Sequence, residues 1–194
     1  MTWKDQANIG AAEWVCGYCG NVVGGNRGYH KDLLAQNARP SDRSKIYVCP
    51  RCDNPTAFIH DETDRVTQIP GPMFGEEVDG LPELVDALYA EIRECVKAGA
   101  YTSAVLSERK LLMHIAVDNG AEEGKSFIAY VEYLSDAGYV PPNGKAWVDE
   151  IRKRSNEANH EIIMATQDDA MQLLDFLEML LKFIYEFPSR IRKK

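Results

Sequence analysis

CGYC at residues 16–19 and CPRC at residues 49–52 are two copies of one motif, in which two residues separate a pair of cysteines. Each motif lets a tight turn present two thiolates to one ion, and the two motifs together supply four ligands. The 29 residues between the pairs, 20–48, exceed the usual interval of a zinc ribbon but are compatible with an inserted loop. The pattern predicts one zinc ion per chain, bound by Cys16, Cys19, Cys49 and Cys52.

Paired disulfides and a redox-active dithiol are the two alternatives for these cysteines. Disulfides are typical of exported proteins, and the N-terminal residues 1–5 lead into no apolar signal segment. A redox site needs only one cysteine pair and leaves the second, matched pair unexplained. Because four thiolates complete the coordination of zinc, we expect a structural ion and no catalysis at the metal.

Short segments rich in β-forming residues flank the cysteine pairs, at 13–15, 45–48 and 57–60. The glycines and asparagines of residues 17–28 suit turns in which backbone N–H groups point at sulfur. We therefore assign residues 1–63 to a β-rich zinc-ribbon module, which has too little apolar content to fold without its metal. Residues 64–80 contain prolines and glycines without periodicity, which is typical of a linker.

Beyond residue 80 the apolar residues recur at helical intervals. Helices are predicted over residues 81–98, 102–118, 126–137, 145–163 and 166–188. Asn119-Gly120 is typical of a helix C-terminus, and Thr166 with Asp169 predicts a capping box at the start of the last helix. Cys95 and His114 lie among apolar residues and are predicted to be core residues. Five helices with short connections indicate an α-helical bundle over residues 81–194, so the predicted fold class is mainly α, with a small N-terminal β-rich zinc ribbon.

The charge of the chain is acidic and unevenly distributed. There are 22 Lys and Arg against 30 Asp and Glu, a formal net charge of −8, which argues against a protein that coats nucleic acid by bulk electrostatics. Residues 1–60, however, contain seven basic against five acidic residues. Hydrophobic residues make up 45% of the chain, which excludes a wholly disordered protein, and no stretch approaches the roughly 18 apolar residues of a membrane span. We expect a cytoplasmic protein with a mildly basic module and an acidic body.

A row of polar residues marks the predicted fourth helix. Arg152, Asn156 and His160 follow at intervals of four residues and so share one stripe of the helix. A cation, an amide and an imidazole in a row can bind a phosphate and move a proton near neutral pH. The alternative is a solvated helix face. Glu108 and Arg109 stand among apolar positions of the second helix, so we expect one of them to be buried and paired, with Arg109 close to the polar row.

The sequence Ile151-Arg152, followed by Asn156-Glu157-Ala158 and His160-Glu161, resembles an uncharacterised bacterial domain, domain of unknown function 4145, which often follows a zinc ribbon. That family is usually placed in the HEPN superfamily of helical proteins. The resemblance covers nearly the whole chain, from the cysteine motifs to about Pro188. It implies a dimeric, five-helix HEPN-like bundle, often part of a bacterial or phage antiviral-defence or toxin system.

In active HEPN members, Arg and His motifs from two protomers form a metal-independent ribonuclease site, whereas other members are non-catalytic partners or RNA-binding modules. The resemblance therefore implies catalytic roles for Arg152 or Arg154, for Asn156 and for His160. The active pattern has a gap of four to six residues before the histidine. Arg154 leaves a gap of five and Arg152 a gap of seven.

Two functions are compatible with these features. The chain is expected to be a nucleic-acid- or protein-binding module, with Arg27, Lys31, Arg43 and Arg109 as binding residues. The alternative is a metal-independent endoribonuclease with a composite dimer active site. We expect a homodimer whose partner is RNA or a larger effector protein, with no membrane involved. The surface for self-association is predicted at Trp147, Phe176, Leu180 and Phe183.

Overall fold

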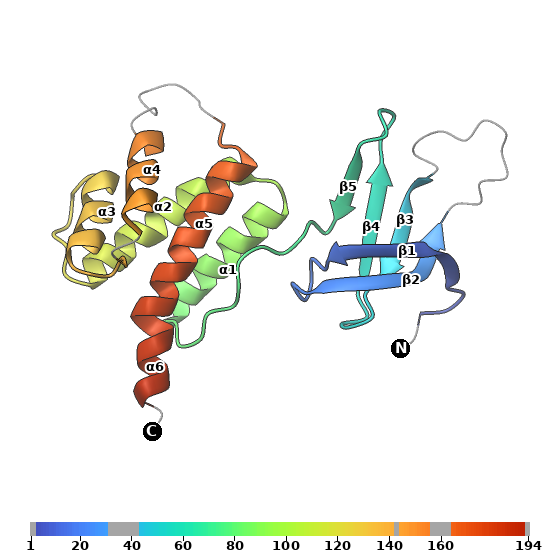
Figure 1. Ribbon diagram of the computed structural model, residues 1–194, viewed down its shortest axis with the longest axis horizontal. Coiled ribbons are helices and arrows are strands. Elements are labelled where there is room, and N and C mark those ends of the chain that lie inside the picture. The colour runs from blue at the N-terminus through green and yellow to red at the C-terminus, as the bar shows by residue number, and fades with distance from the viewer. Residues whose placement is uncertain (1–2, 31–42, 142–143, 156–163, 193–194) are drawn as a thin grey trace. The chain divides into compact units, whose positions relative to one another are not determined.

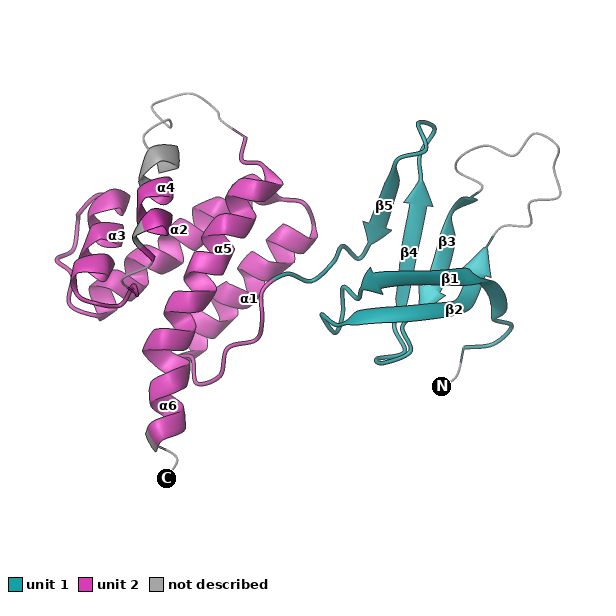
Figure 2. Ribbon diagram, viewed as in Figure 1, with its two compact units in different colours: residues 1–74 teal, residues 75–194 magenta. Residues whose placement is uncertain are grey.

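The protein is described by a computed structural model over residues 3–30, 43–141, 144–155 and 164–192. The chain divides into two compact units, Met1–Phe74 and Gly75–Lys194, which Figure 2 shows in different colours. The domain boundaries predicted from the sequence stay predictions.

The first unit is a five-stranded antiparallel sheet, with the strands in chain order across it (Figure 1). Its strands are β1 (Ala7–Val15), β2 (Val22–His30), β3 (Lys45–Val48), β4 (Pro55–His60) and β5 (Val66–Ile69). The predicted fold class, mainly α, is therefore wrong, because the chain combines this sheet with a separate helical unit.

Two strands that the sequence analysis overlooked explain that error. Strand β2 contains three glycines, which resemble turn residues in a sequence. One of them, Gly28, is needed for pairing, since a Cβ atom there would lie 1.9 Å from the carbonyl oxygen of Ile46 on β3. Strand β5 lies within the residues that were assigned to a linker.

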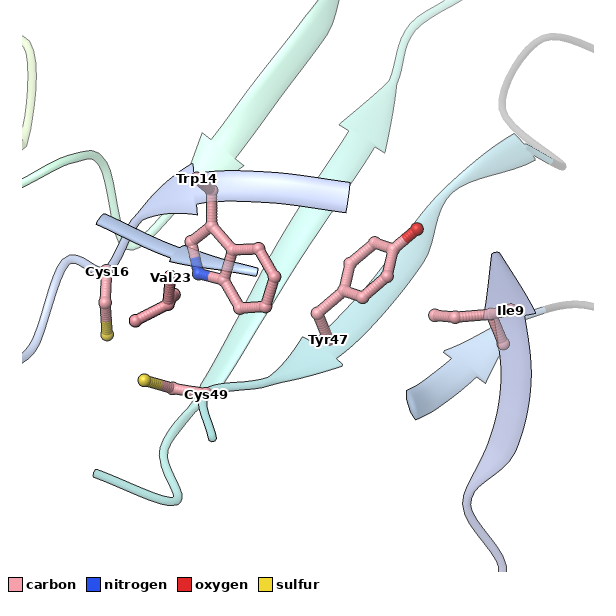
Figure 3. Close-up of a cluster of buried hydrophobic side chains, with 6 residues drawn as sticks. All are labelled: Ile9, Trp14, Cys16, Val23, Tyr47 and Cys49. Atoms are coloured by element: carbon pink, nitrogen blue, oxygen red, sulfur yellow. The ribbon is translucent and has the colours of Figure 1, made fainter. Parts of the chain in front are cut away.

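The core of the first unit is small and runs along one face of the sheet. Its buried members are Ile9, Trp14, Cys16, Val23, Tyr47 and Cys49. In Figure 3 the two cysteines lie at one end of this cluster and Ile9 at the other, with Trp14 and Tyr47 between them. The Trp14 and Tyr47 rings are 5.3 Å apart, and Phe58 packs edge-on against both. The cysteines are thus part of the apolar core.

The second unit is helical. Its helices are α1 (Glu83–Lys97), α2 (Tyr101–Asp118), α3 (Phe127–Asp136), α4 (Lys145–Ser155), α5 (Gln167–Leu181) and α6 (Phe187–Arg192), with a π-helical turn, η3 (Lys182–Glu186), before α6. Helix α2 contacts α1, α3 and α5, and α3 contacts α4 (Figure 1). The predicted capping box is confirmed, because the side chains of Thr166 and Asp169 each accept a hydrogen bond from the other's backbone N–H group.

The C-terminal helix extends beyond the predicted end. Helix α5 passes through the π turn η3 directly into α6, which ends at Arg192. Pro188 is the second residue of α6 and directly follows the π-helical turn η3, where the regular α-helical hydrogen-bond pattern is already interrupted. Proline was therefore a weak signal for the end of this helix.

Candidate functional site

Two turns of the same shape present the four cysteines. Strand β1 ends directly before Cys16 and strand β3 ends directly before Cys49. In the first turn the Cys16 N–H donates to the carbonyl of Asn21 at 2.9 Å. In the second turn the Cys49 N–H donates to the carbonyl of Asn54, also at 2.9 Å. The equal spacing in the sequence therefore reflects two equivalent turns at the ends of two strands.

Both turns close with the same local chemistry. The residue after the second cysteine has a positive φ in each, 67° at Gly20 and 58° at Asp53. The next residue is asparagine in each, and its side-chain amide donates back to the carbonyl of the second cysteine. Glycine and aspartate tolerate this left-handed conformation better than most residues. These two positions hold the cysteine pairs in matching orientations.

The four sulfur atoms form a compact cluster, and all of them lie within 4.8 Å of one another. The Sγ atoms of Cys16 and Cys52 are 3.7 Å apart, and those of Cys19 and Cys49 are 4.0 Å apart. A disulfide requires about 2.05 Å, so these are four free thiols. A tetrahedral ion with bonds of about 2.3 Å to sulfur has edges of about 3.8 Å. The cluster can therefore hold a metal ion, and its geometry is consistent with zinc.

The four thiols differ in burial, and burial and hydrogen bonding shift the pKa values of two of them in opposite directions. Cys16 and Cys49 are fully buried, and Cys19 and Cys52 are half-buried. Burial raises the pKa of the Cys16 thiol to about 12. Burial also acts on Cys19, but hydrogen bonds from the backbone and side chain of Asn21 and from neighbouring thiols outweigh it and lower its pKa to about 7. A bound cation would offset the cost of a buried thiolate at Cys16.

A second feature of the first unit is a cavity of about 720 Å³ on the sheet. Its apolar and aromatic lining includes Ile9, Tyr47, Phe58 and Val66, and its polar lining includes Glu13, His30, Arg43, Lys45 and His60. A volume of this size, with an apolar lining and a few convergent polar groups, is typical of a ligand site.

A chain of three side chains lies beside this cavity. Asp64 accepts a hydrogen bond from Nδ1 of His60 at 2.9 Å through one carboxylate oxygen, and binds Nη1 of Arg43 at 2.8 Å through the other. The hydrogen bond from His60 and the charge of Arg43 hold the pKa of Asp64 below its usual value, although partial desolvation acts against them. Sequence reasoning missed this pair. The available signal was a tight turn over 61–64 that places the two residues four positions apart.

The predicted binding residues of the first unit are placed in different environments. Arg27 is exposed on β2, and Arg43 is exposed and paired with Asp64. Lys31 lies outside the described residues. Within the part of the chain that the structure describes, Arg27 does not line the cavity with Arg43.

Glu108 and Arg109 on α2 are placed differently from each other. Glu108 is fully buried, and neither of its carboxylate oxygens has a hydrogen-bond partner among the described residues. Burial and the charge of Asp175 raise the pKa of Glu108 to about 8. Arg109 lies over the ring of Phe127, with its guanidinium carbon 4.4 Å from the ring centre, and burial lowers its pKa. The predicted burial is confirmed for Glu108, but among described residues it is not paired.

The predicted polar row lies at or beyond the limit of what the structure describes. Arg152 and Arg154 belong to α4, but their side chains are outside the description. Asn156 and His160 lie outside the described residues altogether. Their proposed catalytic roles, and the proximity of Arg109 to them, therefore stay predictions.

The apolar surface predicted for self-association is only partly exposed. Trp147 and Phe183 are 40% and 46% exposed, whereas Phe176 and Leu180 are fully buried in the core of their own unit. The prediction that His114 is a core residue is also wrong, since this side chain is exposed on α2. Cys95 is half-buried.

Comparisons with known proteins bear on the helical unit. Residues 90–194, more than half of the chain, match a family model described as a domain of unknown function (DUF4145). No curated protein and no solved structure matches the chain. Among the helices described here, none is long and apolar enough to cross a membrane.

Proposed function

The chain belongs to the DUF4145 family, and because that description assigns no activity, we propose from its geometry that it is a zinc protein whose N-terminal unit binds single-stranded RNA. The observation that carries the zinc site is the cluster of four thiols, presented by two equivalent turns with sulfur separations of 3.7 and 4.0 Å. Cys16, Cys19, Cys49 and Cys52 would hold one zinc ion, which would tie the ends of β1 and β3 together.

RNA binding is supported by the surface that this metal would stabilise. Proteins bind single strands by placing cations along the backbone and aromatic side chains against the bases. Arg27 and Arg43 are exposed, and Lys45 lines the cavity beside Phe58. Tyr18 is 50% exposed in the turn between the first two cysteines. The excess of basic residues in this part of an otherwise acidic chain favours an anionic partner.

Elemental analysis tests the metal. Protein purified without added metal should contain close to one zinc per chain. Reduced, folded protein without zinc would refute the proposed zinc site.

Fluorescence anisotropy with a labelled single-stranded RNA tests the partner. The dissociation constant should rise steeply with salt, and Arg43→Gln should lower the slope of its logarithm against log salt by about 1, because one phosphate contact is lost. Arg65→Gln is the matched control, since Arg65 is an exposed arginine of the same unit, in the hairpin between β4 and β5, and does not line the cavity among the described residues. No binding even at low salt would refute the RNA proposal.

The wider role rests on the resemblance to HEPN proteins. On that basis we place the protein in the bacterial cytoplasm, as a homodimer in a defence or toxin system. Four free thiols suit a reducing compartment, and the exposed rings of Trp147 and Phe183 offer apolar surface for self-association. The alternative, a composite endoribonuclease site with His160, depends on residues outside the description. Light scattering that shows a monomer at tens of micromolar would refute the dimer.

A further inference from the structure

His60 is held beside the sheet-face cavity by an oriented carboxylate. Its Nδ1 donates to Oδ1 of Asp64 at 2.9 Å, and Oδ2 of Asp64 is held by Arg43 at 2.8 Å. Since an ionised carboxylate only accepts hydrogen bonds, Nδ1 carries the proton, and Nε2 is left as the basic nitrogen. His60 lines the cavity and its side chain is 21% exposed. A base fixed by a third group in this way is a recurrent element of acid–base catalysis.

The hairpin that carries the pair is itself rigidly built. Oδ1 of Asp61 accepts hydrogen bonds from the backbone N–H groups of Thr63 and Arg65, at 2.8 and 3.0 Å, and from the Thr63 hydroxyl. Asp64 has a positive φ of 63°, which turns its side chain back over His60. The carboxylate is thus positioned by the turn as well as by its two partners.

The strand register brings further polar residues to the same cavity. His30 on β2 is directly opposite Lys45 on β3, and Lys45 is directly opposite Phe58 on β4. His60 follows Phe58 by two residues and so shares its face, as a diagonal neighbour of Lys45 at about 7–8 Å between Cα atoms. All three polar residues line the cavity. The cavity therefore combines two imidazoles with an ammonium group, while Glu13 on β1 is the acid that faces them.

We infer that this cavity cleaves RNA, with His60 as general base, Asp64 as its positioning residue and Lys45 as the cation that faces the reacting phosphate. The inference rests on the proposed RNA binding. It differs from a ribonuclease site in the helical unit, because every residue that it uses belongs to the first unit.

The chemistry is a transesterification that needs no co-reactant. Nε2 of His60 takes the proton of the ribose 2′-hydroxyl, and the 2′-oxygen attacks the adjacent phosphorus. The bond from phosphorus to the 5′-oxygen breaks, and that oxygen takes a proton from His30 in its imidazolium form. The products are a 2′,3′-cyclic phosphate and a 5′-hydroxyl, and solvent returns the two imidazoles to their starting protonation states. RNA suits such a site because its nucleophile is part of the substrate.

The ammonium of Lys45 is already oriented by the fold. Its Nζ donates to the carbonyl of Ile9 at 2.7 Å, which leaves further N–H donors for a phosphate oxygen. Negative charge that develops on phosphorus is stabilised most by a donor fixed before the reaction begins. Lys45 is therefore placed to act on the transition state more than on binding.

The test uses the full-length, zinc-loaded protein with two labelled RNAs of one sequence. One has ordinary ribose, and the other has 2′-O-methyl ribose, which can bind but cannot be cleaved by this route. The ordinary RNA should be cut to products ending in 2′,3′-cyclic phosphate, and the methylated RNA should bind intact. His60→Gln should lower the cleavage rate by about 10²–10⁴-fold, with binding of the methylated RNA within two-fold of wild type. His114→Gln is the matched control, an exposed histidine of the helical unit that should change neither.

Asp64→Asn separates positioning from folding. It should lower the rate without changing the affinity for methylated RNA, and the ¹⁵N resonances of His60 should lose their preference for the Nδ1–H tautomer. Unchanged rate and tautomer would overturn the role of Asp64.

The outcomes also separate this inference from the proposed function. Binding of both RNAs without cleavage overturns the inference and leaves RNA binding intact, whereas no binding of either overturns both. Cleavage that survives His60→Gln but is lost in His160→Ala assigns the reaction to the helical unit and overturns the inference.

Discussion

The cores of the two units of this chain contain different kinds of side chain. In the sheet unit the buried cluster includes Cys16 and Cys49, and the sulfur atoms continue the apolar core (Figure 3). In the helical unit the largest fully buried side chains are almost all aliphatic or aromatic and come from several helices, with Glu108 as the exception. If the four thiols bind zinc as proposed, the ion completes the core of the sheet unit, whereas the helical core is built from its own side chains.

The two units differ in how much apolar surface each can bury to stabilise its fold. A β-rich module of this size buries little apolar surface to offset the loss of chain entropy, so the proposed structural metal would contribute much of its folding free energy. The helical unit instead buries a carboxyl group, that of Glu108, which has no hydrogen-bond partner among the described residues. The comparison predicts that the units respond to different perturbations.

Loss of the metal cluster should produce the largest effect. Cys16→Ser, or removal of the metal by a chelator, should unfold the sheet unit, because structural zinc contributes on the order of 10–16 kcal/mol of apparent binding free energy. Two-dimensional ¹H–¹⁵N NMR should show the dispersed signals of residues 7–69 collapse while helical signals persist. Cys95→Ser, in the half-buried cysteine of α1, is the matched control and should leave zinc binding unchanged. Simultaneous loss of the dispersed signals of both units would show that the two units do not unfold independently.

A cavity in the helical core should give the next largest effect, confined to that unit. Leu174 is fully buried on α5, so Leu174→Ala should lower the free energy of unfolding of the helical unit by about 2–5 kcal/mol. Urea denaturation followed by the helical circular dichroism signal measures this. Leu106→Ala, at a position 63% exposed on α2, should stay within about 0.5 kcal/mol of wild type. Loss of zinc from the Leu174 variant would contradict the independence of the two units.

Glu108 should make the helical unit sensitive to pH. Its pKa is raised from 4.5 to about 8 in the folded state, so the unfolded state ionises first as pH rises. The stability associated with the neutral carboxyl is fully present below about 4.5, falls between about 4.5 and 8, and is constant above that.

Glu108→Gln should remove this fall and stabilise the unit at pH 8 by on the order of a few kcal/mol. Thermal denaturation between pH 5 and 8 measures it, with the exposed Glu123→Gln as control. If Glu108→Gln instead destabilises the unit at pH 8, the carboxyl is ionised and paired.

The smallest effect is expected at the start of α5. Thr166→Ala removes the capping box with Asp169 and should cost about 1 kcal/mol of helical-unit stability. Thr166→Ser keeps the hydroxyl and should restore most of the loss, as measured by thermal denaturation. Equal melting temperatures for Thr166→Ala and wild type would contradict the assigned cap.

The helices were the part of the fold most accessible from sequence. Periodicity placed α2 within one residue of its observed start, and Gly120, with φ of 102°, ends it as predicted. Predictions of burial were wrong where a residue lies next to apolar residues in the sequence but points to a different side of its helix. His114 adjoins apolar residues along the chain, but on α2 it lies away from the face that Leu111 and Ile115 bury.

The candidate site shows the same division. The cysteine cluster was predictable because the spacing within each pair is local and the turns around the two pairs are equivalent. The pairing of His60 with Asp64 depends on a hairpin turn and on the positive φ of Asp64. The spacing of four residues is visible in the sequence, but this backbone conformation is not. The cavity depends on strand register, and β2 could not be recognised because Gly28 looks like a turn residue until the approach of Ile46 is known. The features that could not be predicted from the sequence therefore depend on contacts between residues far apart in the chain.

Zinc bound by four thiolates at the core of the sheet unit is the proposal on which the difference between the two units depends. X-ray absorption at the zinc edge, on protein purified without added metal, tests it most directly. The spectrum should show a first shell of four sulfur atoms at about 2.3 Å from zinc. A protein without zinc, or a first shell that contains nitrogen or oxygen ligands, would contradict it.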